Sequence, residues 1–277
     1  MAHLGRAPMS EPAHPAVGSS CYNAAMETLS FPGALALIDD RSAALRAAAV
    51  AAGMDAQVPG CPDWTVADLV AHLGEVHLSW AAVVAAGPAS EPPAEDAVDV
   101  TPHGELLEWS ADATARLLAA LTEAGPDRMC WTWWEETAVA PNTAGAVARH
   151  QVQEAAVHAF DAQQAGGRPE PLPLAVAADG VSEHLTVELP TNGPWPYEPG
   201  TVVLRTGAGG TWLVSLSPEG VHVLEGGAHG SVHRTATVTA DPSDMVLTFY
   251  RRDIGHALQV DGDPDLVPQL LAWPNLD

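Results

Sequence analysis

The sequence RHQVQEAAVHAFDAQQAGG, residues 149–167, carries the pattern on which the fold and the site both depend. It has the composition of a helix that ends at a pair of glycines. On a helix of 3.6 residues per turn, one stripe is polar and contains His150, Gln151, Glu154, His158 and Asp161. A solvated helix face usually pairs Glu with Lys or Arg, whereas this stripe pairs Glu with His. The stripe therefore indicates a polar site rather than an ordinary surface.

Glu154 and His158 are four residues apart, so both project from one helix face about a turn from each other. A carboxylate and a neutral imidazole that converge in this way are typical ligands of a divalent metal. Two ligands from one helix need at least a third from another element, and the segment 65–87 offers His72 and His77. His77 falls inside the apolar stripe of that segment and His72 at its edge, so the pattern alone slightly favours His77. For each histidine, a hydrogen-bonded position near the core is the alternative interpretation.

Apolar residues at helical spacing predict four helices in the first part of the chain, over 31–52, 65–87, 103–124 and 142–167. Thr65, with Asp68 three residues later, has the pattern of a capping box at the start of the second helix. The Pro- and acid-rich segment 88–102 is predicted to be a loop. Four helices with such connections favour an antiparallel bundle over residues 31–169, preceded by a flexible tail, residues 1–30.

The pattern changes from residue 170. One further helix is predicted over 172–190, followed by alternating segments that read as strands over 201–206, 211–216, 221–225 and 235–240. Two short helices are expected at 242–249 and 263–273. Residues 170–277 are therefore predicted to form a small α+β domain with an antiparallel sheet, and the whole chain an α+β protein of two domains.

Composition excludes several classes of partner and mechanism. The chain has 277 residues and a formal net charge of −24, without the basic surface that nucleic acids or anionic membranes require. No apolar run has the expected length of a membrane span, and no export signal is evident, so we expect a cytoplasmic protein. All eleven basic residues are arginines, which excludes Schiff-base and P-loop lysines. Three widely spaced cysteines predict no disulfide framework.

Two stretches together resemble a known family. CPDWTVADLVAHLGEVH at 61–77 and RHQVQEAAVHAFDAQQA at 149–165 are similar to the motifs of the mycothiol-dependent maleylpyruvate isomerase family, which are DinB-like metal-binding four-helix bundles of actinobacteria. AADGVSEHL at 177–185 and TADPSDMVLTFYRRDI at 239–254 resemble the family's C-terminal domain. The resemblance extends over nearly all of the chain after about residue 30.

The resemblance implies the roles of individual residues. It implies that His72, Glu154 and His158 bind a divalent ion, most commonly Zn²⁺, and that Asp161 can orient an imidazole. It implies an arginine for anion or thiol binding, for which Arg252 aligns best and Arg251 next, although FYRR departs from the family's usual sequence there. Trp134, in a tryptophan-rich stretch, is expected to line the cavity. Cys61 precedes a helix, and we interpret it as structural.

The resemblance also implies a reaction. A metal site with an open position can bind the thiol of mycothiol as a thiolate, which adds to a small electrophile and permits cis–trans isomerisation or S-transfer. The implied partners are a low-molecular-weight thiol and a small-molecule substrate. A non-catalytic metal-binding regulatory module and a zinc-dependent hydrolase of small amides or thiol conjugates remain alternatives. The sequence identifies neither the substrate nor the oligomeric state.

Overall fold

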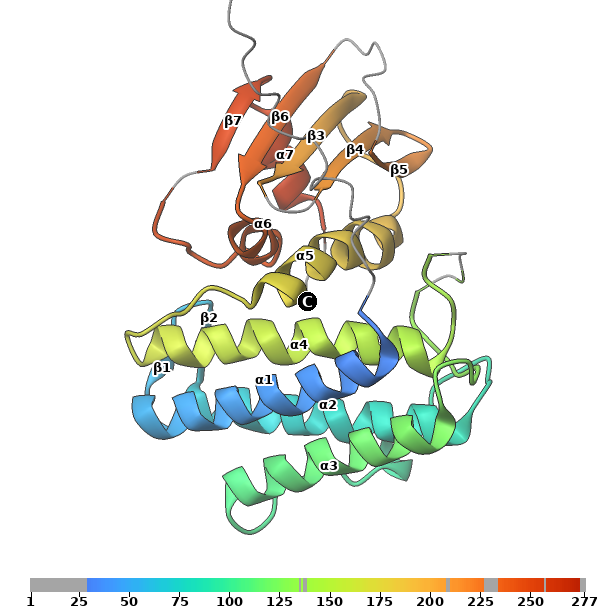
Figure 1. Ribbon diagram of the computed structural model, residues 1–277, viewed down its shortest axis with the longest axis vertical. Coiled ribbons are helices and arrows are strands. Elements are labelled where there is room, and N and C mark those ends of the chain that lie inside the picture. Colours follow the sequence, from blue (N-terminus) through green and yellow to red (C-terminus); the bar gives the residue numbers. More distant parts are fainter. Residues whose placement is uncertain are drawn as a thin grey trace, which may run out of the picture.

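A computed structural model of the chain describes residues 29–134, 136, 139–207, 210–226, 234–256 and 258–274 (Figure 1). The predicted tail, residues 1–30, lies almost wholly outside these residues, as does Cys21. The described chain forms a helical layer below and a sheet with helices above it, as predicted (Figure 1).

The helical layer is a bundle of α1 (Phe31–Ala52), α2 (Val66–Ala86), α3 (Leu106–Ala124) and α4 (Ala144–Ala165). Helix α4 packs on α1 and α2, while α3 packs on α2 and α1. The capping box predicted for α2 is present, because Asp68 Oδ2 accepts a hydrogen bond of 2.8 Å from the Thr65 backbone N–H and the Asp68 N–H donates to Thr65 Oγ1. The Thr143 hydroxyl caps α4 by accepting from the backbone of Ala146. The loop between α2 and α3 contains one short 3₁₀ turn, Glu95–Ala97.

A two-stranded hairpin that the sequence did not predict lies between α1 and α2. Strands β1 (Gln57–Val58) and β2 (Cys61–Thr65) pair antiparallel. Pro59 and Pro62 suggested only a break in the chain, but Pro is compatible with such a short exposed hairpin because an edge position needs no ladder N–H. The hairpin closes the end of the bundle at which α2 begins (Figure 1).

Helix α2 differs from expectation in one respect. Among the described helices, only α2 has the length and apolar composition of a membrane-spanning segment. Its large apolar side chains, which include Leu69, Leu73 and Val84, are buried against the other helices of the bundle. The hydrophobicity of α2 is accounted for by its place in the core.

The C-terminal part begins with a nearly continuous helical segment. Helix α5 (Leu174–Glu183) passes directly into a π-helical turn, His184–Glu188, and then a 3₁₀ turn, Leu189–Asn192. The five strands that follow are β3 (Gly200–Thr206), β4 (Gly210–Ser217), β5 (Gly220–Glu225), β6 (Thr235–Ala240) and β7 (Gln259–Gly262). Helices α6 (Pro242–Phe249) and α7 (Leu266–Ala272) complete this part.

The sheet has the order β5-β4-β3-β6-β7 and is mixed. The prediction of an antiparallel sheet is wrong for its centre, where β3 and β6 pair in parallel with Val202 opposite Ala236. The other neighbouring strands pair antiparallel. Strands β4 and β5 lie between β3 and β6 in the chain, which agrees with the rule that parallel neighbours cannot be joined by a tight turn. Strand β7 was not predicted.

The two parts share one apolar core. Helices α5 and α6 lie between the sheet and α4, whereas α7 packs against β3 and β6 (Figure 1). Buried side chains of α4, such as Val152, belong to the same cluster as Val181 of α5 and Val246 of α6. Polar residues on the upper side of α4 are therefore placed at the junction between the bundle and the C-terminal domain.

Candidate metal centre

Helices α2 and α4 bring three potential metal ligands together. His72 lies near the start of α2 and His158 near the end of α4, so the two helices run in opposite directions where these residues meet. The Nε2 atom of His72 is 3.1 Å from Oε1 of Glu154, and Nε2 of His158 is 3.3 Å from the same oxygen. One donor atom from each residue lies within 4.8 Å of the others. The residues that the resemblance implied as ligands thus converge on a single point.

The second histidine from α2 lies elsewhere. His77 is fully buried, and its Nδ1 is 3.2 Å from the hydroxyl of Thr114 on α3. Burial lowers the pKa of His77 to about 4, so the ring is neutral. Of the two histidines on α2, the apolar stripe identifies the more deeply buried one, His77, and not the one that faces Glu154. His72, at the edge of that stripe, instead faces α4.

A chain of polar contacts extends from His158 into the C-terminal domain. Nδ1 of His158 is 3.0 Å from Oδ2 of Asp161, one turn further along α4. Arg252, which follows α6, donates from Nε and Nη2 to the two carboxylate oxygens of Asp161 at 2.9 and 2.7 Å. Asp161 is fully buried and Arg252 nearly so. This arrangement fixes the ring of His158 with Nε2 directed toward Glu154, as is typical of a metal-binding histidine.

The β1–β2 hairpin closes over this chain of contacts at Gly60. A Cβ atom on Gly60 would lie 2.9 Å from Oδ1 of Asp161 and 3.0 Å from Nε of Arg252. A side chain at this position would push against the ion pair. Sequence reasoning did not identify Gly60 or the hairpin as part of the site, and the signal available was the Pro-Gly-Cys-Pro sequence directly before the capped helix.

The electrostatics of the site favour ionised carboxylates and bound cations. Burial alone would lower the pKa of His158, but the carboxylates of Glu154 and Asp161 outweigh it and raise the pKa to about 9. Burial opposes ionisation of Glu154, yet the imidazoles of His158 and His72 hold the pKa of this carboxyl well below its usual value. In the same way His158 and Arg252 lower the pKa of Asp161 against the effect of its burial. Asp161 is already paired with Arg252, so Glu154 is the carboxylate whose negative charge would be available to a cation between the imidazoles.

The candidate ligands are accessible from one side. The side chains of His72, Glu154 and His158 are 32%, 23% and 9% exposed. Trp64, at the end of β2, covers part of this opening, with its ring centroid 4.7 Å from that of His72. The arrangement combines a buried, fixed His158 with a more open His72, which leaves room for a small ligand next to an aromatic wall.

The donor set fits a divalent metal ion. Two imidazole nitrogens and one carboxylate are the ligands of several three-residue zinc sites that keep a fourth position open. His158 is held through Nδ1 by Asp161 and therefore offers Nε2. The donors of His72 and Glu154 are close enough to bind the same ion.

The remaining predicted site residues take different positions. Arg252 reaches the site only through Asp161, and its Nη1 also donates to the carbonyl of Tyr250. Arg251 turns away, because its guanidinium donates to backbone carbonyls at the end of α7, including Leu271. Trp134 is buried 5.7 Å from the ring of His150, one turn before Glu154, and belongs to a separate group.

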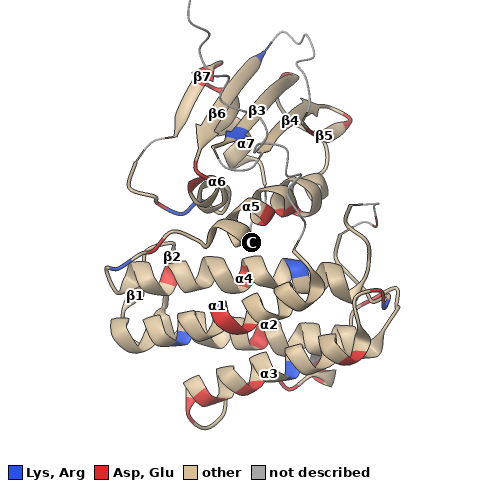
Figure 2. Ribbon diagram, in the orientation of Figure 1, with Lys and Arg blue, Asp and Glu red and all other residues tan. Residues whose placement is uncertain are grey.

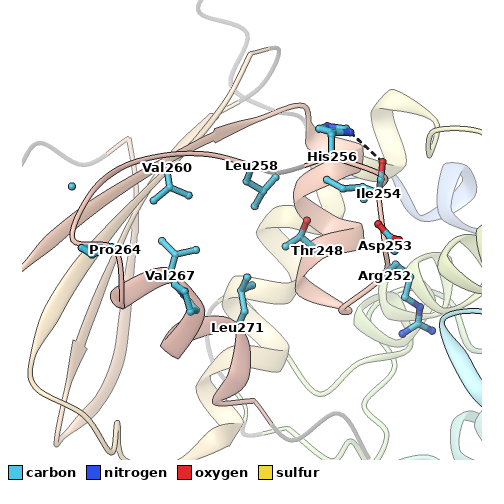
Figure 3. Close-up of a pocket in the computed structure, with 12 residues that line it drawn as sticks. Thr248, Arg252, Asp253, Ile254, His256, Leu258, Val260, Pro264, Val267 and Leu271 are labelled. Atoms are coloured by element: carbon cyan, nitrogen blue, oxygen red, sulfur yellow. Dashed lines mark hydrogen bonds between the residues drawn. The ribbon is translucent and has the colours of Figure 1, made fainter.

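An open groove of about 520 Å³ lies in the C-terminal domain, between the segment after α6, strand β7 and helix α7 (Figure 3). Its wall is mainly apolar and includes Ile254, Leu258, Val260, Val267 and Leu271. Figure 3 shows the guanidinium of Arg252 directed away from the groove and toward the bundle. None of the three candidate ligands lines this groove, so it is a feature distinct from the candidate metal centre.

Known proteins resemble the helical bundle in sequence and both domains in fold. A family model described as "Mycothiol maleylpyruvate isomerase N-terminal domain" matches residues 35–163, which is the helical bundle. No curated protein matches the chain in sequence.

Two solved structures are similar over both domains. One is a crystal structure of the mycothiol-dependent maleylpyruvate isomerase, with 14% sequence identity, a TM-score of 0.55, and coverage of 86% of this chain and 95% of the other. The second is a histidine-to-alanine mutant of the mycothiol-dependent maleylpyruvate isomerase, with 15% identity, a TM-score of 0.53, and coverage of 81% and 90%. At this identity the likeness establishes a shared fold.

Proposed function

We propose that the chain is a metal-dependent, thiol-using enzyme, because residues 35–163 match the family model of the mycothiol maleylpyruvate isomerase N-terminal domain. The proposed ligands are His72, Glu154 and His158, and the proposed ion is Zn²⁺ or a related divalent metal. The observation that supports this most strongly is the convergence of two imidazole Nε2 atoms on one oxygen of Glu154. The thiol is mycothiol, and the substrate is a small electrophile with a conjugated double bond, such as a maleylpyruvate-like compound.

A divalent ion at this site would supply Lewis acidity that lowers the pKa of a bound thiol, so that thiolate is available at neutral pH. The protein's part is to position the ligands. Asp161 engages Nδ1 of His158, so that Nε2, which faces Glu154, would be the atom that binds the metal. Arg252 neutralises Asp161 and keeps its oxygens in place. We therefore assign Arg252 to positioning, because its hydrogen bonds to Asp161 and Tyr250 would have to break before it could bind a substrate carboxylate.

The proposed reaction needs no nucleophile from the protein. Sulfur of the thiolate adds to one carbon of the double bond, the resulting single bond rotates, and elimination of the same thiolate restores the double bond in the trans form. Retention of the adduct would instead make the enzyme a thiol S-transferase. Cys61 is a poor substitute for the small thiol, because burial raises the pKa of its own thiol although Arg252 lies nearby.

The open side of the site suits this chemistry. His72 and Glu154 are partly exposed next to the indole of Trp64, which offers an apolar face to a small conjugated substrate. On the buried side of the site, the surroundings of His158 and Asp161 exclude water from the imidazole of His158, which Asp161 holds in place. A small thiol could therefore approach from the exposed side without displacing Asp161 or Arg252.

The test is cis–trans conversion of maleylpyruvate, followed by the change in its ultraviolet absorption, with and without mycothiol. We expect turnover that requires both the thiol and a divalent metal. His72→Ala and His158→Ala should each abolish turnover together with metal binding. His222→Ala, which changes an exposed histidine on β5, is the matched control and should behave as the unchanged protein.

The same assay separates the alternatives. Turnover of amide or thiol-conjugate substrates without added thiol would indicate a hydrolase. A stable thiol–substrate adduct would indicate an S-transferase. Metal binding without turnover of a panel of activated alkenes would indicate a binding module and would contradict the proposal.

A further inference from the structure

A second group of metal-ligand side chains lies further back along α4. It contains His150 from α4, Glu183 from the last turn of α5, and Glu188 from the end of the π-helical turn. One donor atom from each lies within 4.8 Å of the others. His150 is one helical turn before Glu154, so both groups use the same polar stripe. Figure 2 shows acidic segments of α5 facing α4 across the junction of the two domains.

The contacts within the group centre on His150. Its Nδ1 is 2.9 Å from Oε1 of Glu183 and 3.9 Å from Oε1 of Glu188. The side chain of Glu183 is 1% exposed, that of His150 is 11% and that of Glu188 is 19%. Two carboxylates therefore face one imidazole in a nearly closed space. A single imidazole, even when protonated, cannot neutralise both carboxylates when both are ionised, and burial raises the pKa of Glu188 to about 7.

Glu183 supplies an independent observation. Its second oxygen, Oε2, is buried and accepts no hydrogen bond from any residue that the structure describes. A buried carboxylate oxygen without a partner is costly, and such oxygens normally bind a hydrogen-bond donor or a metal. An additional positive group next to Glu183 would give this oxygen a partner.

The π-helical turn accounts for the position of Glu188. Residues five apart in an α-helix differ by about 140° in direction, so Glu183 and Glu188 would then face different sides. In a π-helix the backbone hydrogen bonds join residues five apart, which places residues at this spacing above one another. The turn at His184–Glu188 thus directs both carboxylates toward His150. Single π-helical turns occur often at functional sites.

We propose that His150, Glu183 and Glu188 form a second divalent-metal site, at the junction of the bundle and the C-terminal domain. One imidazole and two carboxylates suit ions that accept both nitrogen and oxygen ligands, such as Mn²⁺, Fe²⁺ or Zn²⁺. A bound ion would link α4 to α5. The two carboxylates would neutralise its positive charge. The proposal does not depend on the reaction at the first centre.

The contrary interpretation is a metal-free ion pair. Trp80, Trp133 and Trp134 surround His150, with ring centroids 6.2, 5.5 and 5.7 Å away, and aromatic faces favour an imidazolium. In that case His150 would remain protonated against Glu183. A count of bound ions distinguishes the two interpretations.

The experiment uses the full chain with the first centre removed by His72→Ala and His158→Ala. Mn²⁺ binding is measured by the loss of the free-ion electron paramagnetic resonance signal, and Zn²⁺ binding by equilibrium dialysis. We expect one ion per chain to remain bound in this double variant. Addition of Glu188→Gln should remove it, whereas addition of Glu170→Gln, an exposed acid in the linker before α5, should not.

Glu188→Gln is the preferred change because Glu188 is the more exposed of the two acids, and Glu183→Gln serves as the second variant. Circular dichroism identifies the variants that fold. The bound ion should also raise the Tm of the double variant, and Glu188→Gln should remove that increase. The proposal would be overturned if the His72→Ala, His158→Ala variant folds and binds neither Mn²⁺ nor Zn²⁺. It would also be overturned if this variant binds the ion equally well after Glu188→Gln is added.

Discussion

Arg252 of the C-terminal domain donates two hydrogen bonds to Asp161 of α4, at 2.9 and 2.7 Å; Asp161 is fully buried and Arg252 nearly so. Asp161 in turn holds Nδ1 of His158. The orientation of His158, a candidate metal ligand in the bundle, is thus set through Asp161 by Arg252, which lies 91 positions after Asp161 in the chain. The C-terminal domain is therefore part of the site, although it contributes none of the three candidate ligands.

Arg252→Gln should weaken metal binding at the first centre. It removes the fork that holds both oxygens of Asp161, so we expect metal affinity to fall about 10- to 100-fold, as when other partners of metal-binding histidines are changed. Isothermal titration of the metal-free protein with Zn²⁺ measures this. The matched control is Arg251→Ala, since the guanidinium of Arg251 donates to backbone carbonyls at and just after the end of α7 and does not reach Asp161. Equal affinity in the two variants would show that Arg252 does not position His158.

Gly60→Ala should destabilise the fold and the site together. The new methyl group would lie within about 3 Å of Asp161 and Arg252, and a buried overlap of this kind typically costs about 1–3 kcal/mol. Urea denaturation measures the loss of free energy of unfolding, and Zn²⁺ titration the effect on the site. Gly207→Ala is the control, because no atom of the described residues lies within 4 Å of the position of its Cβ. If Gly60→Ala were as stable as the control, the close approach of the hairpin would be contradicted.

Much of the fold follows from sequence patterns. The four bundle helices lie within a few residues of their predicted bounds, because Thr65, Asp68 and the glycines after α2 and α3 mark helix ends chemically. The small β1–β2 hairpin and β7 escaped prediction because both are short, and exposed β7 has no buried face to produce alternation. The parallel pairing of β3 with β6 depends on strand order, which local sequence does not encode.

The sequence predicted the site only in part, because the site also depends on how distant segments pack together. Helical spacing identified Glu154 and His158, but the choice between His72 and His77 depended on how α2 is rotated against α4, and only the resemblance favoured His72. Glu183 and Glu188 lie on a segment that was predicted to be one helix. Nothing in their spacing reveals the π-helical turn that directs both toward His150. The placement of Glu183 and Glu188 next to His150 is set by the packing of α5 on α4, which the local sequence does not show.

His77 should make the protein sensitive to acid. Its pKa is about 4 in the folded protein because of burial, against about 6.5 when unfolded, so the unfolded state binds the proton more tightly. The free energy of unfolding should therefore fall as pH decreases from 6.5 to 4, by on the order of 3 kcal/mol from this residue. Urea denaturation of the metal-free protein across this range tests it. His77→Gln, which cannot titrate, should flatten the dependence.

The same variant also tests which histidine of α2 binds the metal. His77→Gln changes a side chain bonded to Thr114 and leaves His72, Glu154 and His158 intact, so we expect it to retain its metal. His72→Ala should lose the metal. Elemental analysis of both purified variants gives the comparison, and loss of metal in His77→Gln with retention in His72→Ala would reverse the assignment.

The most direct measurement is anomalous X-ray diffraction at the zinc edge from crystals of the zinc-loaded protein. We expect a peak about 2.0–2.2 Å from Nε2 of His72, Nε2 of His158 and a carboxylate oxygen of Glu154. No peak there, with these side chains bound only to one another, would contradict the proposed metal centre and the thiol chemistry assigned to it.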